Sequence, residues 1–389
     1  MSACGGGGPE APTPPNTGGA ASNGNGGAAT DASSSESTSS GTLASCPMFP
    51  ATAVFNTRID DTSRFPVHAR STAWVASIIS IGPRRLHLDW GNDDNPANLD
   101  SYYGIPINIV DGSSATTLWP LARFDIPPAR TEPSDTPYVD ESDCAAPSGT
   151  GGQVIHRGCN TLAVNLRRFP FPLDGHVLSE SGNCNDPNVC GDHHVLVVEQ
   201  GACRLWEGYA AYQQSGQWYV MGTSAWDLNS LALRPKNWTS SDAAGLPITP
   251  FLARAAEASS GEVRHALRVT LRDSVLARSF VWPARHAAGG STPTDGVPFG
   301  AVLRLKASFV IPANWSTQAK ALATAMKRYG LYVADIGTDF YVQGEPNATW
   351  SDTTRTQLQS IDMGQMEFVD MTGITTRTGF NENSMAASW

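Results

Sequence analysis

The sequence predicts a mainly β protein, an antiparallel β-sandwich or jelly-roll-like fold with a few short helices. Its 389 residues include 37 glycines, 27 prolines and 11 tryptophans, whereas charged residues make up only 16%. That share is well below the roughly 25% of an average soluble domain. Several segments alternate between apolar and polar residues, which is the period of a strand with one buried face. This combination is typical of a secreted β protein.

Two parts of the chain differ sharply in composition. Residues 5–45 are mostly Gly, Ala, Ser, Thr, Asn and Pro and show no apolar periodicity. Because such a segment buries too little apolar surface to offset its ordering entropy, we expect residues 1–45 to form a disordered tether. Residues 46–389 suffice for a single large β-rich domain, with a Cys-rich irregular insertion at about 127–190.

Charge and apolar runs limit the classes of partner. The net charge is −10 and no basic run is interleaved with aromatic residues, so we do not expect a nucleic-acid partner. No stretch approaches 18 consecutive apolar residues, so no transmembrane span is expected.

The cysteines indicate an oxidising compartment. Cys4 lies in Met-Ser-Ala-Cys-Gly, which resembles the end of a bacterial lipoprotein signal and predicts a lipid anchor at Cys4. The hydrophobic run of such a signal would then lie upstream of Met1; otherwise the resemblance is accidental. The other six form an even set that fits three disulfides, with free buried thiols as the alternative. They are Cys46, Cys144, Cys159, Cys184, Cys190 and Cys203.

Periodicity and turn residues give the elements in chain order. Residues 105–110 predict an edge strand because they include Pro106. Residues 317–329 predict an amphipathic helix that Ser316 or Thr317 caps and Gly330 closes. A short helix is expected at residues 249–258. Further strands are expected at residues 73–81, 86–90, 217–228, 263–271, 280–282, 301–311, 331–335 and 339–343, the last two as a pair.

The loop at residues 89–100 is acidic and rich in Asn. Its carboxylates and amides are Ca²⁺ ligands in principle, but the spacing of an EF-hand loop is missing. A solvated cluster of turns is therefore favoured over a structural Ca²⁺ site, and we expect no other cofactor. His193 and His194 are adjacent, so on a strand they point to opposite faces and do not chelate one metal.

The stretch GDHHVLVVEQGACRLWEGYAAY, residues 191–212, predicts a β-hairpin that turns at Gln200-Gly201. An imidazole and a carboxylate then lie opposite each other beside core residues. They form either a proton-transfer pair or a structural ion pair. Glu207, His194 and Asp192 are catalytic candidates on this basis, and Tyr209 is a substrate-binding candidate. The predicted cross-strand pairs are Val198/Cys203, Leu196/Leu205, His194/Glu207 and Asp192/Tyr209, all on one face.

Further candidates lie on a strand face or near strand ends, where functional groups often collect. His265 shares the apolar face of residues 263–271, His286 follows the strand at 280–282, and Asp335 begins a Gly-containing turn. Each of them also fits a structural role, but together they extend the catalytic candidates to His265, His286 and Asp335. The remaining substrate-binding candidates are Arg285, Trp282, Asp339 and Trp350. No G-x-S-x-G, H-E-x-x-H, P-loop or G-x-G-x-x-G motif is present, and no metal ligands are predicted.

Six phrases occur in order between about residues 55 and 350: GDHHVLVVEQGACRLWEGYAAY, SSDAAGLPITPFL, GEVRHALRVTL, FVWPARH, LRLKASF and ALATAMKRYGLYVADIGTDFYVQG. In wording and order they resemble a group of secreted, β-rich proteins of soil bacteria and some fungi. The resemblance implies export but no particular reaction. Members of that group can carry lectin-type carbohydrate-binding modules, which implies a polysaccharide partner. The Cys-rich insertion departs from the group's pattern.

Three functions are compatible with these residues. We expect a secreted or surface-anchored protein that acts on a polysaccharide, foremost a glycoside hydrolase using carboxylate and histidine acid–base chemistry. A non-catalytic glycan-binding surface lipoprotein would instead use aromatic side chains as stacking platforms. A polysaccharide lyase would abstract a proton next to the carbonyl of a uronate.

Overall fold

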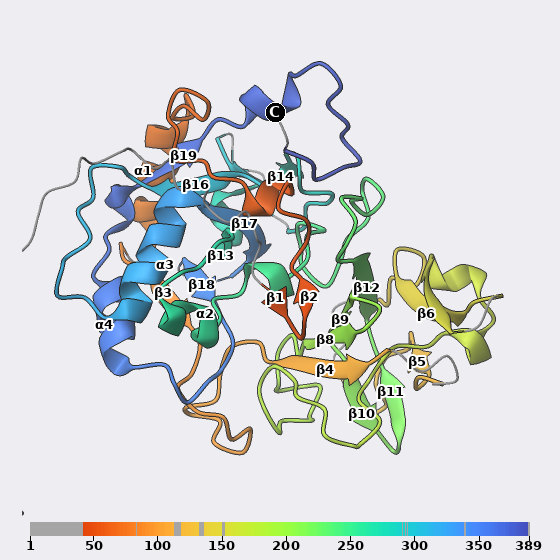
Figure 1. The fold of residues 1–389 in the computed structure, drawn as a ribbon. Helices are drawn as coiled ribbons and strands as arrows, with labels where there is room; N and C mark the ends of the chain where they lie inside the picture. Colours follow the sequence, from red (N-terminus) through yellow and green to blue (C-terminus); the bar gives the residue numbers. More distant parts are fainter. Residues whose placement is uncertain are drawn as a thin grey trace, which may run out of the picture. The chain divides into compact units, whose positions relative to one another are not determined.

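The computed structural model describes residues 42–82, 84–112, 118–131, 136–149, 152–289, 291, 293, 295–337 and 340–387. This part of the chain is β-rich with a few short helices, as predicted (Figure 1). Of the predicted tether, residues 1–41 lie outside the described residues. Its last residues are ordered, because β1 (Thr42–Leu43) pairs with β2 (Cys46–Pro47) in a short hairpin.

The largest sheet has six strands of mixed direction. β13 runs parallel to β17, and β18 runs parallel to β3, whereas the other pairs are antiparallel. The predicted pairing of residues 331–335 with 339–343 is wrong, because β13 lies between β17 and β18. The strand order is β19 (Met366–Val369), β16 (Val302–Leu305), β17 (Leu331–Ile336), β13 (Leu267–Leu271), β18 (Tyr341–Gln343) and β3 (His87–Asp89).

A second sheet of four strands contains the predicted hairpin. β8, β9 and β12 form an antiparallel meander, and β4 joins the edge in parallel, at the edge position that Pro106 predicted. The parallel pairs are the exceptions within the mainly antiparallel arrangement that was predicted. Parallel neighbours need a long connection, which a periodicity argument does not show. The order is β12 (Gly222–Asp227), β9 (Arg204–Tyr209), β8 (Val195–Gln200) and β4 (Ile107–Asp111).

Smaller sheets complete the β structure. β10 (Tyr212–Gln214), β11 (Gln217–Tyr219) and β5 (Ala122–Arg123) form a three-stranded sheet. Besides β1 and β2, two further pairs of the described residues stand alone: β6 (Asp143–Pro147) with β7 (Gln153–Arg157), and β14 (Leu276–Phe280) with β15 (Val297–Phe299). The predicted insertion at 127–190 therefore contains a regular hairpin, β6 and β7.

The amphipathic helix is α3 (Thr317–Arg328), close to the predicted bounds. Ser316 caps it, since its side chain accepts a hydrogen bond from the Ala319 N–H. In Figure 1, α3 and α4 (Asp352–Gln359) lie beside the large sheet, and α2 (Ala255–Ser260) packs against α3. The other short helices are α5 (Thr372–Thr375), η1 (Val54–Asn56), η2 (Cys159–Thr161), η3 (Val164–Leu166), η4 (Thr249–Phe251), η5 (Asp273–Val275) and η6 (Met363–Gln365).

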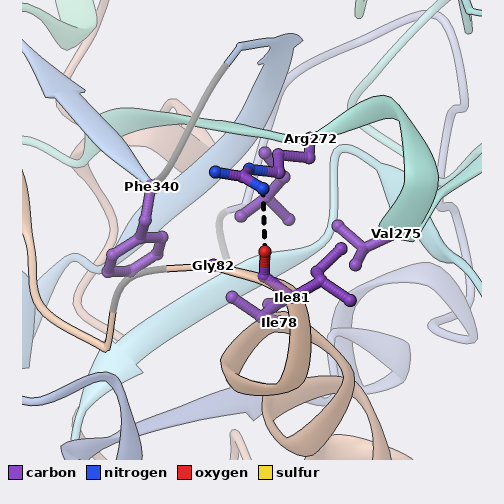
Figure 2. A pocket seen from close by; sticks show the side chains of 7 residues that line it. Ile78, Ile81, Gly82, Arg272, Val275 and Phe340 are labelled. Atoms are coloured by element: carbon purple, nitrogen blue, oxygen red, sulfur yellow. Dashed lines mark hydrogen bonds between the residues drawn. The ribbon is translucent and has the colours of Figure 1, made fainter.

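Residues 73–81 were predicted to form a strand, and this is wrong: they belong to helix α1 (Ser71–Ile81). The buried residues Ser71, Trp74, Val75 and Ile78 recur at helical spacing, although β-branched residues favour a strand. Figure 2 shows the helix end, where Arg272 Nη1 donates to the Ile81 carbonyl over 2.8 Å. The pocket drawn there has a volume of about 10 Å³, room for a single water.

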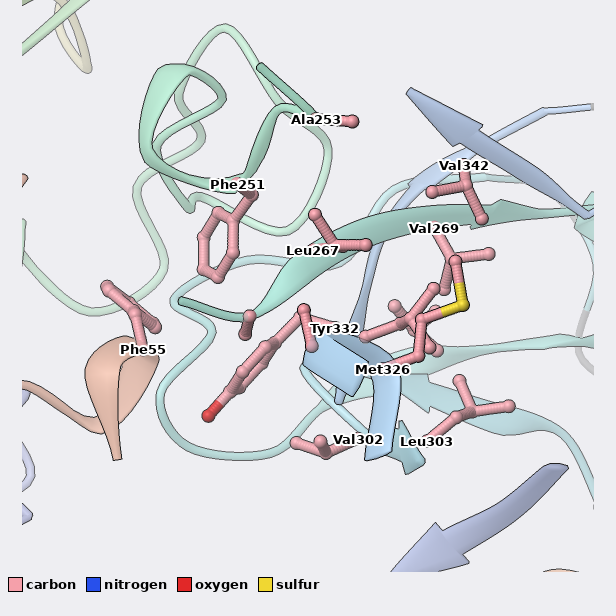
Figure 3. Packing of buried hydrophobic residues seen from close by; sticks show 14 of the residues in the cluster. Phe55, Phe251, Ala253, Leu267, Val269, Val302, Leu303, Met326, Tyr332 and Val342 are labelled. Atoms are coloured by element: carbon pink, nitrogen blue, oxygen red, sulfur yellow. The ribbon is translucent and has the colours of Figure 1, made fainter. Parts of the chain in front are cut away.

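A continuous apolar core joins α3 to the large sheet. Figure 3 shows Met326 of α3 beside Val269 and Leu303. At the other end of the cluster, Phe55 and Tyr332 pack edge to face, with ring centroids 5.6 Å apart. The same cluster includes Val198, Leu205 and Trp226 of the four-stranded sheet. The two large sheets are therefore held by one buried cluster.

Three disulfides confirm the prediction from the six cysteines, and they indicate an oxidising, extracellular environment. Cys46–Cys203 joins the first hairpin to the β8–β9 turn, while Cys144–Cys159 and Cys184–Cys190 lie within the insertion. The fully buried Asp143 anchors the insertion to the rest of the domain, because its Oδ2 accepts from Arg157, Arg234 and the Ala225 N–H.

Candidate functional site

A polar cavity of about 620 Å³ lies where the open end of the β8–β9 hairpin meets the C-terminal end of β17. Asp192 and Tyr209 come from the hairpin, Asp335 from β17, and His286 from the segment that follows β14. These four predicted site residues, which come from three separate parts of the chain, thus face one cavity. Segments around residues 138–141 and 239–243 complete its wall.

A β-bulge determines where Asp335 points. In regular alternation Asp335 would share the apolar face of Leu331 and Val333. The register between β13 and β17 shifts after Val269/Val333, so that Thr270 pairs with Asp335. This shift moves Asp335 to the face of Arg268, and the two form an ion pair of 3.3 Å. Bulges commonly re-aim a side chain beside a functional site.

Arg268 holds two carboxylates at the cavity wall. The guanidinium is fully buried, and its Nη2 lies 2.8 Å from Asp242 Oδ1 as well as 3.3 Å from Asp335 Oδ2. Burial raises the pKa of Asp335; the charge of Arg268 opposes this, and the charge of Asp192 reinforces it. The pKa of Asp242 is raised well above its ordinary value, again by burial and against the charge of Arg268. A raised pKa is the property that a carboxylic acid needs to donate a proton near neutral pH.

The hairpin is formed, but its register is displaced by two residues from the prediction. Val198 pairs with Leu205 and Leu196 pairs with Glu207. The loop is longer than Gln200-Gly201 because Cys203 takes a left-handed conformation, with φ of 50°, and bonds to Cys46. A shift by two keeps each side chain on its expected face but changes its partner. His194 therefore lies next to Tyr209, with ring centroids 5.5 Å apart, and not opposite Glu207.

Glu207 lies outside the cavity, and its assignment as a catalytic residue is corrected. The side chain is completely buried on β9, and its oxygens accept from the Ile248 N–H, the Thr249 N–H and the Thr249 hydroxyl over 2.8–3.0 Å. These bonds tie the four-stranded sheet to the start of η4. Burial raises the pKa of Glu207, against the effect of these donors. We assign Glu207 a structural role.

The partner of His194 is Glu180, a residue that was not predicted from the sequence. His194 Nδ1 donates to Glu180 Oε2 over 2.6 Å, and Nε2 donates to the Ser241 carbonyl over 2.8 Å. Two acceptors require both ring nitrogens to carry hydrogen, so the ring is an imidazolium. Burial lowers its pKa, but the charge and hydrogen bond of Glu180 outweigh burial and raise the pKa to about 9. Because Ser241 lines the cavity, the hydrogen bond from His194 to the Ser241 carbonyl holds this part of the wall in place.

This ion pair predicts a stability loss at alkaline pH. Because the pKa of His194 is raised from 6.5 to about 9 in the folded state, its stabilisation is complete below pH 6.5 and is lost as the pH rises through 9. We expect the free energy of unfolding to fall by about 3 kcal/mol over that window. Urea unfolding at several pH values measures it. His194→Gln should flatten this slope, and the exposed control His176→Gln should retain it; an unchanged slope in His194→Gln would contradict the assignment.

Two tyrosines form an aromatic platform in the cavity. The rings of Tyr138 and Tyr209 lie nearly parallel, with centroids 6.4 Å apart, and the Tyr138 hydroxyl donates to the Ser240 carbonyl over 3.2 Å. Tyr209 donates to Asp192 Oδ1 over 3.4 Å. The Tyr138 ring lies on the bare backbone of Gly222, the residue of β12 paired with Tyr209. Nothing in the local sequence around Tyr138, within the Cys-rich insertion, pointed to this position.

Gly222→Ala should displace Tyr138, because a Cβ atom at residue 222 would overlap the Tyr138 ring. We expect the free energy of unfolding to fall by about 1–3 kcal/mol, as for other overpacked sites, together with weaker ligand binding. Gly208→Ala is a matched control on the adjoining strand β9, since its Cβ would meet Ala211 and Phe169 at 3.5 and 3.6 Å, an ordinary contact. Calorimetric unfolding of both variants tests this; equal losses would contradict it.

The buried Arg234 holds the remaining wall segments in place. Its guanidinium donates to the carbonyls of Glu141 and Thr239, and it pairs with Asp143 at 2.9 Å. The Glu141 carboxylate in turn accepts from the Thr239 N–H over 2.8 Å. Glu141 and Asp242 both line the cavity, and neither was predicted from the sequence. The acidic and aromatic lining therefore rests on a buried cationic scaffold.

The other predicted site residues lie elsewhere. His265 donates to Glu257 and lies outside the cavity, whereas Arg285 is buried and binds the carbonyls of Arg234 and Glu382. Trp282 donates to the Ser384 carbonyl, and the buried Trp350 packs on Trp90 with ring centroids 4.9 Å apart. Asp339 lies outside the described residues. We assign His265, Arg285, Trp282 and Trp350 to packing and structural hydrogen bonding.

In the acidic loop at 89–100, the carboxylates of Asp93 and Asp94 accept hydrogen bonds from other groups of the protein. Asp93 accepts from the Asn95 N–H, the Asn98 amide and the Ser101 hydroxyl over 2.7–2.8 Å, and Asp94 accepts from the Ala348 N–H. Across the described ranges, no three His, Cys, Asp or Glu side chains are grouped so as to hold a metal ion. Within the same ranges, no helix has the length and apolarity needed to cross a membrane.

Comparisons with protein-family models, curated proteins and solved structures found no match to this chain. The resemblance to secreted proteins of soil bacteria and fungi stays a prediction.

Proposed function

We propose that this protein is an extracellular glycoside hydrolase and that the cavity at the end of β17 is its active site. The observation that carries the proposal is the pair of carboxyl groups, Asp335 and Asp192, that face one open cavity from unlike environments. Asp335 is largely buried and has a raised pKa, while Asp192 is exposed. Two carboxyl groups with divided roles are the machinery of most glycoside hydrolases.

In the proposed reaction Asp335 is the general acid. It donates its proton to the glycosidic oxygen of the leaving group, and the charge left on it is stabilised by Arg268, 3.3 Å away. Asp192 serves the opposite face of the sugar, as the base that activates water or as the nucleophile. Tyr138 and Tyr209 offer ring faces against which a sugar can pack.

The lining favours hydrolysis over elimination. A lyase acts on a uronate polymer, whose carboxylates would enter a cavity lined by Glu141, Asp192, Asp242 and Asp335. Those of the four that are ionised would repel a uronate carboxylate, and no Lys or Arg is among the described residues of the lining to pair with it. The second candidate, a glycan-binding protein without turnover, is favoured by the tyrosine platform alone.

Secretion is supported by the three disulfides. Lipidation at Cys4 is a further proposal, which intact mass spectrometry of the native protein tests.

A panel of polysaccharides distinguishes these functions. We expect at least one neutral or cationic glycan to yield reducing ends without the ultraviolet absorbance of an unsaturated product. Absorbance would indicate a lyase instead, and retention on an immobilised glycan without any product would indicate binding alone. If no glycan in the panel is retained or cleaved, the proposed function is wrong.

A further inference from the structure

We propose that the ligand of this cavity carries protonated amino groups, as does a polymer of free amino sugars. The inference rests on the proposed function and specifies its substrate class. It is carried by the balance of charge at the cavity wall, by an unpartnered carboxylate oxygen and by the chemistry of His286.

The described wall of the cavity is strongly acidic. It includes Glu141, Asp192, Asp242 and Asp335, and no Lys or Arg is among the described residues that line it. The nearby Arg268 is one positive charge shared by two of these carboxylates. His194 is already matched by Glu180. When these carboxyl groups are ionised, the groups around the cavity carry more negative than positive charge, and a bound cation would favour that ionised state.

Asp242 presents an unused acceptor. The residue is 1% exposed, and its Oδ1 accepts from Arg268, but Oδ2 is buried and has no hydrogen-bond partner within the described part of the chain. A buried carboxylate oxygen without a donor is costly, and burial accordingly raises the pKa of Asp242; an ammonium group beside this oxygen would favour the ionised form. Because Asp242 lines the cavity, an ammonium group of a ligand would supply the missing donor.

His286 adds a further acceptor. Its Nδ1 lies 2.8 Å from the Ala243 carbonyl, so Nδ1 carries the hydrogen. In the neutral ring Nε2 is then an acceptor. An ammonium has three donors and no acceptor, whereas an N-acetyl group replaces the charge with a carbonyl and a methyl group. The acceptor-rich wall therefore favours the free amine over its acetylated form.

The test compares three tetrasaccharides with the full chain by isothermal titration calorimetry: glucosamine, N-acetylglucosamine and glucose tetramers, at near-neutral pH and low ionic strength. We expect the glucosamine tetramer to bind at least about tenfold more tightly than either neutral one, as charge-assisted hydrogen bonds predict. Added salt should reduce this preference.

Variants of two wall residues test whether the acidic wall of the cavity causes the preference for the glucosamine tetramer. Glu141→Gln should reduce it severalfold, because the amide oxygen can still accept from the Thr239 N–H while the charge is gone. Glu262→Gln, at a 49% exposed side chain paired with Arg264, is the matched control and should leave it unchanged. Asp242→Asn is a second test, monitored by its melting temperature because Asp242 is buried.

The outcomes separate this inference from the function on which it rests. Binding or cleavage of the neutral tetramers as efficient as that of the glucosamine tetramer would overturn the inference and leave a glycoside hydrolase. A preference for glucosamine that survives both Glu141→Gln and Asp242→Asn would also overturn it, because the charge would then lie elsewhere. No binding or cleavage of any tetramer, together with a negative polysaccharide panel, would reject both proposals.

Discussion

Asp335→Asn should lower turnover at least about 100-fold on the glycan that the panel identifies, because general acid catalysis typically contributes 10²–10⁴-fold. An amide of the same shape has no proton to donate to the glycosidic oxygen. Folding should be largely retained, since Asp242 still pairs with Arg268. Initial rates of reducing-end release measure the loss, and glycan affinity should change much less than turnover.

Glu367→Gln is the matched control for this change. Glu367 lies on β19 of the same sheet and pairs with the buried Arg304 at 2.7 Å, but it does not line the cavity. Loss of the Glu367 charge should lower the melting temperature and leave turnover per folded molecule unchanged. If Asp335→Asn behaves like Glu367→Gln, with lower stability and full turnover, Asp335 is not the general acid.

Removing the Cys46–Cys203 disulfide should lower the free energy of unfolding by about 5 kcal/mol, more than removing either of the others. The reason is the closed loop: these cysteines are 157 residues apart, against 15 for Cys144–Cys159 and 6 for Cys184–Cys190. The unfolded chain gains the most conformational freedom when the longest loop opens.

Urea unfolding of the Cys46→Ser/Cys203→Ser double variant measures this loss. The Cys184→Ser/Cys190→Ser variant is the comparison, with an expected loss of about 2 kcal/mol. The slope of unfolding free energy against urea should rise more in the first variant, because its unfolded state is more expanded. Equal losses in the two variants would show that loop length does not determine the stabilisation.

Part of the candidate site could be predicted from the sequence. Asp192 and Tyr209 were predicted from the hairpin, and His286 and Asp335 as polar groups near strand ends; the structure brings all four to one cavity. The pairing of His194 with Glu207 failed for a specific reason. Cys203 is held in the loop by its bond to Cys46, so the hairpin closes two residues later than the Gln200-Gly201 turn implies. A covalent contact across 157 residues is invisible to local turn rules.

Local chemistry determined the β-rich class, the even set of cysteines, helix α3 with its Ser316 cap and the edge position of β4, because each depends on short-range periodicity or on single-residue preferences. The tertiary structure decided the remainder. It made residues 71–81 a helix by burying one face, inserted β13 between β17 and β18, and turned Asp335 toward Arg268 through a bulge. These outcomes depend on contacts between distant segments. Packing and charge pairing across the fold overrode local propensity there.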